Sequence, residues 1–345
     1  MSASSFPTLL IVAITVAVAG WSGWWWVGAS TQETAALRWF EERREEGWVA
    51  DTDSLGVTGY PNRFDTMIEG LELSDPRSGW AWSAPLFQIL SLAYRPTEFI
   101  FVWPETQTIA SPTDRIAVSG DTLRGSLAMI PNLQLTLRKS VIEADKLSLV
   151  AESGWTADLD TVVFATEGIE EGFDPGTGHR IGVRIRDITL SEDLRQQLDP
   201  TGVLPATMEG GQLDATVGFA APVSLTTLED GMPGADSVQV DDFQLTWGKL
   251  DLRAQGTLTA DAAGFAEGRL TVRAKNWREM LALAESNGAV GSDGAAAIEF
   301  GLGLLAGLSG DPNALEVPLT FQQGRTTLGP LSLGPAPRLR VAVGN

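Results

Sequence analysis

The stretch "RIGVRIRDITL", residues 180–190, alternates apolar and polar side chains at nearly every step. In an extended chain Ile181, Val183 and Ile185 point to one side, and the arginines between them point to the other. Alternation of this kind is typical of an antiparallel strand with one face in a core and one face in water. This stretch therefore predicts a half-buried strand.

The same alternation recurs from residue 50 onward, interrupted by Gly, Asp, Pro and Asn. The segments that carry it are "GLELSD" (70–75), "TEFIFVW" (97–103), "RIAVSG" (115–120), "GSLAMI" (125–130), "LQLTL" (133–137), "DKLSLVAES" (145–153), "QLDATVGF" (212–219), "DFQLTWGKLDLRAQGTLTA" (242–260), "GRLTVRA" (268–274) and "EVPLTF" (316–321). So many closely spaced strands favour one extended, curved antiparallel β-sheet body over an α/β enzyme with parallel strands.

Helices are expected in only a few places after residue 50. "SEDLRQQLD" (191–199) begins with a serine cap, and "NWREMLALAESNG" (276–288) begins with an asparagine cap and ends at Gly288. "GSDGAAAIEFGLGLLAGLSG" (291–310) is predicted as a third helix, although its glycines weaken it. The fold class is therefore mainly β with a few short helices.

The N-terminal segment is predicted to cross a membrane. Residues 7–27, "PTLLIVAITVAVAGWSGWWWV", form an apolar run that, as a helix at about 1.5 Å per residue, spans roughly 31 Å, the thickness of a hydrocarbon core. The tryptophans at its end resemble an interfacial belt. The alternative is a cleaved signal peptide, for which "AVA" at 17–19 offers a small-residue site.

The helix is expected to run from about residue 6 to about residue 46, through "TQETAALRWFEERREEGW" (31–48), and to stop at Gly47, which would lift the following domain off the membrane. Residues 1–47 are therefore predicted as membrane anchor and helical stalk. A soft boundary at "LDPTGVLPAT" (198–207) divides the rest into β-rich parts at 48–200 and 201–345, with one continuous domain as the alternative. No lysine or arginine precedes the span, and five glutamates offset the three arginines that follow it, so loop charge does not set the orientation.

Composition limits the partners and the chemistry. The 345 residues carry a net charge of −20, which disfavours nucleic acid through repulsion from phosphates. There is no cysteine, which excludes disulfides, thiolate metal sites and cysteine nucleophiles. The 43 % hydrophobic content is enough to bury a core, so packing must hold the fold.

Catalytic motifs are weak. The one histidine, His179, lies in the turn-like "DPGTGHR" and reads as a loop residue; a triad built on it stays open as an alternative, without a G-x-S-x-G elbow. Carboxylate pairs at 158 and 160, 170 and 171, and 241 and 242 have no calcium-type spacing and read as solvated faces. "GLGLLAG" (301–307) lacks dinucleotide-loop spacing. We therefore expect no enzyme activity, no cofactor and no metal site.

Two groups of residues are singled out as candidate sites. In "GYPNRFD" (59–65), the residues Gly59, Pro61, Arg63 and Asp65 are interpreted as a structural clamp at a tight corner, with a ligand site as the alternative. An aromatic cluster follows within 24 residues, either as core or as the lining of an apolar groove for acyl chains. Its members are Trp80, Trp82, Phe87, Tyr94, Phe99, Phe101 and Trp103.

The chain resembles a bacterial family known as domain of unknown function 2125. The resemblance is carried by "GYPNRFD" (59–65), by the "WSAP…Q…YRP…WP" element within 82–104, by "LTWGKLDLRAQGTLTADAAGFAEGRLTVRAKNWREML" (245–281) and by "GRTTLGPLSLGPAPRL" (324–339). It covers nearly the whole chain and transfers no catalytic residue. In architecture alone the chain also resembles the AsmA-like envelope proteins, which are associated with moving lipids along apolar β-grooves.

These resemblances imply a single-pass inner-membrane protein whose β-rich domain faces the periplasm. The expected function is envelope maintenance through binding or transfer of lipid along an apolar groove, with membrane lipid and other envelope proteins as partners. A non-enzymatic scaffold with a closed core is the first alternative, and an envelope hydrolase is the second.

Overall fold

The computed structural model describes residues 5–200, 202–229, 231–288, 290–309, 311–329 and 331–340. Within these residues the chain forms 18 strands and five helices, and every strand pair with an assigned register is antiparallel. The predicted fold class, mainly β with an N-terminal long apolar helix and few short helices, is confirmed. The chain divides into two compact units, residues 1–118 with 123–126, and residues 119–122 with 127–345.

The first unit starts with the long helix α1 (Ser5–Glu45), as expected, and Gly47 follows it with a φ of +90°. The strands that follow are β1 (Val49–Asp51), β2 (Ser54–Thr58), β3 (Arg63–Asp75), β4 (Trp80–Leu92), β5 (Arg95–Val102), β6 (Thr106–Ala110) and β7 (Arg115–Ser119). Strand β3 is central, because β1, β2 and β4 all pair with it. Strand β8 (Thr122–Met129) lies at the division between the units.

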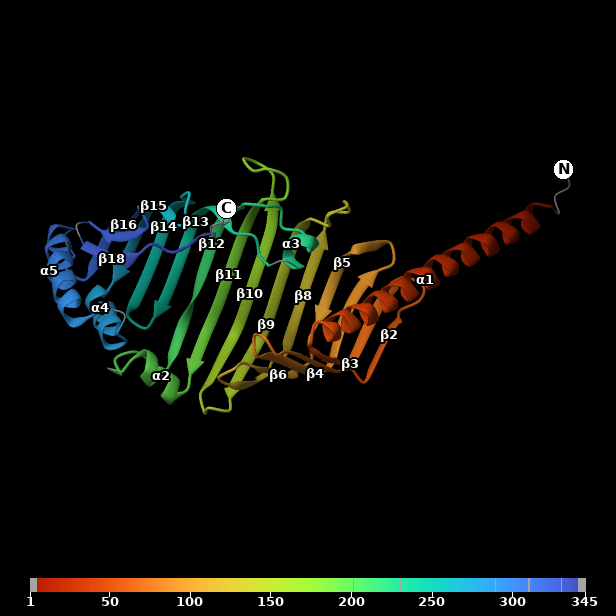
Figure 1. Ribbon diagram of the computed structural model, residues 1–345, viewed down its shortest axis with the longest axis horizontal. Coiled ribbons are helices and arrows are strands. Elements are labelled where there is room, and N and C mark those ends of the chain that lie inside the picture. Colours follow the sequence, from red (N-terminus) through yellow and green to blue (C-terminus); the bar gives the residue numbers. More distant parts are fainter. Residues whose placement is uncertain are drawn as a thin grey trace. The chain divides into compact units, whose positions relative to one another are not determined.

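Helix α1 has two different halves. Its first part, Thr8–Gly20, is exposed on all sides, and Figure 1 shows it projecting beyond β2 and β3. Its second part packs on the sheet, where Phe40 is buried with Ala50, Ile68 and Leu71. The segment expected to be a stalk therefore lies along the strands of the first unit, because its apolar side chains find a sheet face to cover.

The second unit is an antiparallel meander in which each strand pairs with the next. Its strands are β9 (Leu137–Ala151), β10 (Thr156–Ile169), β11 (Gly178–Leu190), β12 (Thr207–Phe219), β13 (Ala235–Trp247), β14 (Leu250–Ala260), β15 (Ala266–Lys275), β16 (Ala314–Gln322), β17 (Arg325–Leu328) and β18 (Leu331–Pro335). The boundary expected at 198–207 lies inside this unit, in the connection from α2 to β12.

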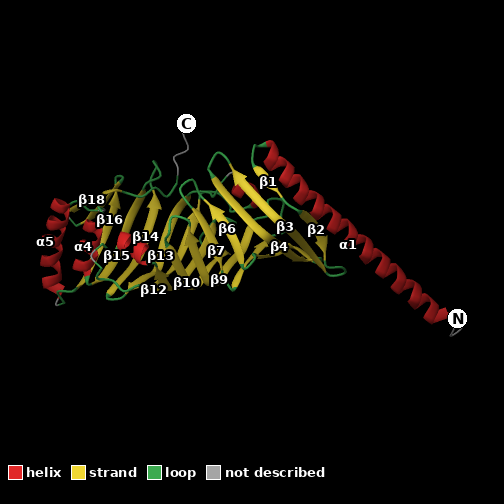
Figure 2. Ribbon diagram, turned by 90° about the horizontal axis from the view of Figure 1, so that it is seen from below, coloured by secondary structure: helices red, strands yellow, loops and turns green. Residues whose placement is uncertain are grey.

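Four short helices connect the strands of this unit: α2 (Glu192–Leu198), α3 (Leu225–Glu229), α4 (Trp277–Ser286) and α5 (Ser292–Ser309). Ser191 caps α2 as predicted, since its hydroxyl accepts from the Leu194 N–H. Asn276 precedes α4 but makes no cap bond; its side-chain amide donates to the Lys249 carbonyl instead. Figure 2 shows α4 and α5 beside β15 and β16.

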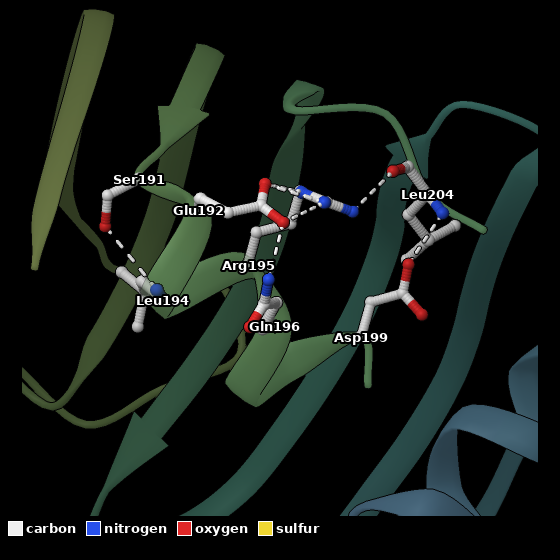
Figure 3. A network of polar contacts seen from close by, with 7 residues as sticks. All are labelled: Ser191, Glu192, Leu194, Arg195, Gln196, Asp199 and Leu204. Atoms are coloured by element: carbon white, nitrogen blue, oxygen red, sulfur yellow. Dashed lines mark hydrogen bonds and ion pairs between the residues drawn. The ribbon is translucent and has the colours of Figure 1, made fainter. Parts of the chain in front are cut away.

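A polar network around α2 holds the connection to β12 (Figure 3). Arg195 pairs with Glu192 on the helix and donates to the Leu204 carbonyl at 3.4 Å. Asp199 is fully buried, and its Oδ2 accepts from the Leu204 N–H at 2.6 Å. A buried carboxylate is expensive unless it is hydrogen-bonded, so this contact satisfies both groups.

One predicted strand is wrong. "LQLTL" at 133–137 is mostly a turn, and only Leu137 belongs to a strand. The Asn132 side chain accepts from the Thr136 N–H and donates to its hydroxyl, and the Leu135 N–H bonds back to the Asn132 carbonyl. Asparagine favours such local bonds, and they override a short alternating pattern.

Candidate functional site

Five of the seven predicted aromatic residues form a continuous series of ring contacts in the first unit, named here the aromatic chain. Its members are Phe99, Phe101, Trp103, Phe87 and Trp82. Ring centroids lie 6.4 Å apart from Phe99 to Phe101, 6.2 Å from Phe101 to Phe87 and 5.2 Å from Phe87 to Trp82. Every member is half-buried. Trp82 and Phe87 pack against the buried cluster that contains Phe40 of α1, as the core alternative predicts, and the other members continue from them as a partly exposed apolar surface.

The other two predicted aromatics lie outside this chain of ring contacts. Trp80, the first residue of β4, is 54 % exposed, and Tyr94, in the turn after β4, is 61 % exposed. Trp82, by contrast, is oriented by its indole N–H, which donates to Gln107 Oε1 at 2.7 Å. The indole N–H of Trp82 thereby has an acceptor, while its rings contact Phe87 in the aromatic chain.

The aromatic chain lies on the face of the sheet that α1 covers. Strand register places Phe64, Ser91 and Phe99 in one row across β3, β4 and β5. Phe64 packs on the helix, with its ring centroid 6.1 Å from that of Trp25. Side chains in one row share one face of a sheet, so the aromatic chain begins two strands from the helix, at the level of Trp25.

The second unit presents a larger apolar surface, named here the apolar face. Two rows of side chains cross eight strands, β9 to β16, on the same side, and apart from Gly211 every member is an apolar side chain. The first row is Ile142, Phe164, Val183, Leu213, Phe243, Ala254, Val272 and Val317, and the second is Ala144, Val162, Ile185, Gly211, Leu245, Leu252, Ala274 and Leu315.

Among the described residues, helices cover the apolar face at one end. Ala274, Leu315 and Val317 are buried with Leu302 and Ala306 of α5. On β9 to β13 most of these side chains are only partly covered: Ile142 is 42 % exposed, and the first-row side chains from Phe164 to Phe243 are half-buried, whereas Ala144 of the second row is buried. Sequence reasoning identified several of these residues as strand residues but not as a site, because alternation does not show which strands a helix covers.

The opposite side of the second unit carries most of the charged side chains, as alternation predicts. A hollow of about 500 Å³ lies there, over β9 to β13, lined by Lys139, Glu167, Arg180 and Asp214 and also by the apolar Val141, Val163 and Ala165. Arg180 donates twice to Asp214, at 2.8 and 2.5 Å, and this pair lowers the pKa of the Asp214 carboxyl. A carboxylate with a lowered pKa is a weak base, and an exposed ion pair is common on protein surfaces. The Arg180–Asp214 pair therefore does not indicate a catalytic acid or base in this hollow.

The predicted clamp residues form the corner between β2 and β3. The Arg63 N–H donates to the Gly59 carbonyl at 2.9 Å, and Gly59 has a φ of +101°. The Tyr60–Pro61 peptide bond is cis. Arg63 Nε lies 3.0 Å from Asp65 Oδ1, on the same strand. Gly59 and Pro61 therefore form the corner and Arg63 and Asp65 begin the strand that leaves it, with the arginine about half exposed.

This corner is also bound to α1, which the sequence did not predict. The indole N–H of Trp21 donates to the Pro61 carbonyl and that of Trp25 to the Arg63 carbonyl, each at 2.8 Å. The Ser22 hydroxyl lies 2.8 Å from the Tyr60 hydroxyl. Two tryptophans interpreted only as an interfacial belt thus also fasten the helix to the β2–β3 corner.

His179 is a buried strand residue rather than the loop residue expected. It is 1 % exposed in β11, its Nδ1 lies 3.3 Å from the Thr166 hydroxyl, and its Nε2 has no hydrogen-bond partner among the described residues. Burial lowers the pKa of its imidazole. Its ring packs against Phe219, away from the exposed surfaces.

The carboxylate pairs lie on exposed strand or loop positions. Asp241 and Asp242 lie at the β-bulge of β13, where each accepts from a different glutamine. Within the described residues, no three His, Asp or Glu side chains come together in an arrangement that could hold a metal ion.

A helix long and apolar enough to span a membrane, followed by an antiparallel β body with open apolar surfaces, defines the class: β-rich proteins with one N-terminal membrane-type helix. The chain belongs to the family described as "Uncharacterized protein conserved in bacteria (DUF2125)", whose model matches residues 25–337. Comparisons with curated proteins and with solved structures found no match. The architectural resemblance to AsmA-like proteins stays a prediction.

Proposed function

We propose that the protein is a single-pass inner-membrane protein that binds lipid acyl chains on the open part of its apolar face, as a non-enzymatic component of envelope maintenance. The observation that carries the proposal is the pair of apolar rows across β9 to β16, which the described helices cover at the β14–β16 end alone. Such a face is unfavourable in water, so a ligand that covers it is stabilised.

The dimensions of the open part suit one acyl chain. The five strands β9 to β13 span about 19 Å at roughly 4.8 Å between neighbours. A bilayer core of about 30 Å contains two acyl chains end to end, so one chain is about 15 Å long. Because the side chains of the first row carry no polar group, this surface can accept a hydrocarbon chain without leaving one of their atoms as an unpaired donor or acceptor.

The anchor supports a lipid ligand over a soluble one. Helix α1 has the length and composition of a membrane span, and it is hydrogen-bonded to the first unit through Trp21 and Trp25. In this proposal the β-rich body faces the periplasm. A reporter active only in the cytoplasm, fused after Asn345, should then be silent, and an active reporter would overturn the placement.

Site-specific photo-crosslinking in cells tests the acyl-chain site. A photo-reactive phenylalanine at position 183 of the full chain faces the open apolar side, while the same group at position 184 faces the polar side. Crosslinked phospholipid, detected by mass spectrometry, is expected at 183 and absent at 184. Crosslinks at 183 to protein alone, or equal lipid at both positions, would overturn the proposal, and the former would favour a scaffold that binds envelope proteins.

A further inference from the structure

The length of the apolar part of α1 indicates how deep in the membrane its contacts with the β2–β3 corner lie. Residues 8–20 are exposed around the whole helix and measure about 20 Å at 1.5 Å per residue. That is shorter than a hydrocarbon core of about 30 Å. The span must therefore use the rest of the apolar run, to about Val27. Trp21 and Trp25, with the β2–β3 corner bound to them, then lie at the membrane boundary and not beyond it.

A second turn lies at the same level. The Ala93 N–H donates to the Asn62 carbonyl at 2.9 Å, and Ala93 is buried with Phe64 and Ala29 of α1. The turn from β4 to β5, which carries Tyr94 and leads into Arg95 at the start of β5, is therefore next to the corner that carries Tyr60.

The residues exposed at this level include the aromatic types that favour a membrane interface. The chain has only two tyrosines, Tyr60 and Tyr94; both are on these turns, and they are 53 % and 61 % exposed. Trp24 and Trp26 of α1 are 55 % and 68 % exposed. Tyrosine and tryptophan concentrate at the headgroup layer, where an apolar ring meets a polar tip.

Two arginines flank the tyrosines. Arg63 Nε contacts Asp65, and about half of the Arg63 side chain stays exposed. Arg95 contacts Glu98 through Nη1 at 3.3 Å and is 60 % exposed. Each guanidinium has five N–H donors, so both keep donors free of these carboxylates for a phosphate group.

We propose that the Gly59–Arg63 corner and the Ala93–Pro96 turn are embedded in the phospholipid headgroup layer, with Tyr60 and Tyr94 as interfacial anchors and Arg63 and Arg95 as phosphate contacts. The inference rests on the anchor role proposed for α1 and is independent of acyl-chain binding on the second unit. It places Phe99, the start of the aromatic chain, at the bilayer surface, because Phe99 shares a row with Phe64.

Fluorescence quenching in vesicles measures this depth directly. The chain has no cysteine, so single cysteines can carry a nitrobenzoxadiazole label at one site each. The full-length variants Tyr60→Cys, Tyr94→Cys, Ile14→Cys and Ser78→Cys are reconstituted into phosphatidylcholine–phosphatidylglycerol vesicles. Ser78 is the matched control, because it lies at the far end of β4, next to Arg77, whose guanidinium lies 3.9 Å from Glu46 just after α1.

Labels at 60 and 94 are expected to be quenched severalfold more by lipids with a shallow nitroxide than by aqueous iodide, and the label at 78 only by iodide. The label at 14 should respond to a deep nitroxide. If the labels at 60 and 94 are quenched like the label at 78, while the label at 14 is quenched by the deep nitroxide, the proposed headgroup contact is wrong and the membrane anchor is retained. If the label at 14 is not quenched by the deep nitroxide, the anchor and the headgroup contact are both wrong. Crosslinking at position 183 remains a separate test of acyl-chain binding.

Discussion

The ring of Phe64 occupies the space that a β-carbon on Gly28 would need. Gly28 lies in α1, where glycine is otherwise unfavourable by about 1 kcal/mol relative to alanine. The helix and β3 approach each other closely at this point, and Trp25 and Ala29 pack beside the same ring. The absence of a side chain at residue 28 is thus part of how the helix is held on the first unit.

The first prediction tests this contact. Gly28→Ala should destabilise the docking of α1 by about 1–3 kcal/mol, because overpacking against Phe64 exceeds the gain in helix propensity. Gly23→Ala is the matched control, since its new methyl group would meet open space and should be neutral or slightly stabilising. Thermal unfolding of the full chain in detergent measures both, and equal melting temperatures would contradict the argument.

A second prediction separates the two fastenings of the β2–β3 corner. Trp25→Phe keeps a ring on Phe64 but removes the donor to the Arg63 carbonyl, and should cost about 1 kcal/mol. Arg63→Gln removes an ion pair in which the arginine is half exposed, and should cost less. Chemical unfolding gives the free energy of unfolding of both variants. A larger loss in Arg63→Gln than in Trp25→Phe would show that the Arg63–Asp65 ion pair, and not the indole hydrogen bond, stabilises the corner.

The third prediction concerns pH. Burial lowers the pKa of His179, so the folded protein binds its proton less readily than the unfolded chain. Stability contributed by the neutral imidazole is complete above the ordinary histidine pKa of about 6.5 and falls as the pH drops below it, until the folded-state pKa is passed. One proton limits the slope to about 1.4 kcal/mol per pH unit.

Replacement by a residue that does not titrate in this range checks the assignment. His179→Gln should flatten the pH dependence of unfolding just below the ordinary histidine pKa of about 6.5, relative to the native chain. Thr166→Val, which removes the hydroxyl next to Nδ1, should retain a histidine-dependent slope. An unchanged slope in His179→Gln would assign the pH dependence to the carboxylates instead.

A fourth prediction concerns the connection after α2. Asp199→Ala leaves the buried Leu204 N–H unpaired and should cost about 1–3 kcal/mol, whereas Asp199→Asn keeps an acceptor oxygen and should recover most of that loss. Glu192→Gln, in the same network but on the surface, should cost clearly less than Asp199→Ala, because water screens an exposed ion pair. Melting temperatures of the three variants provide the test, and equal losses for Asp199→Ala and Glu192→Gln would contradict it.

The fifth prediction tests the open apolar face with one charge on either side of one strand. Leu245→Glu puts a carboxylate on the apolar face, and Gln244→Glu puts it on the polar face beside Arg253. Lipid crosslinking from position 183 should fall severalfold in Leu245→Glu and stay unchanged in Gln244→Glu. A melting temperature for each variant separates loss of the ligand from loss of the fold.

The sequence alone determined the elements whose information is local. Alternation in 180–190 predicted strand β11, the serine before "EDLRQQL" predicted the cap of α2, and the apolar run with Gly47 predicted α1 to within one residue at each end. Strand and helix periods, caps and glycine stops act over a few residues, so they can be recognised without knowing the neighbours. The family also followed, because its motifs are contiguous stretches.

Tertiary structure alone decided which local elements meet. Trp25 and Arg63 are 38 residues apart, and no local pattern pairs an indole with that carbonyl. The rows of the apolar face depend on strand register, which a bulge after Val240 shifts, and on α5 covering only one end of them. Register, helix placement and burial are set by long-range packing of many side chains at once, so the surfaces that carry the proposed function appear only in the folded chain.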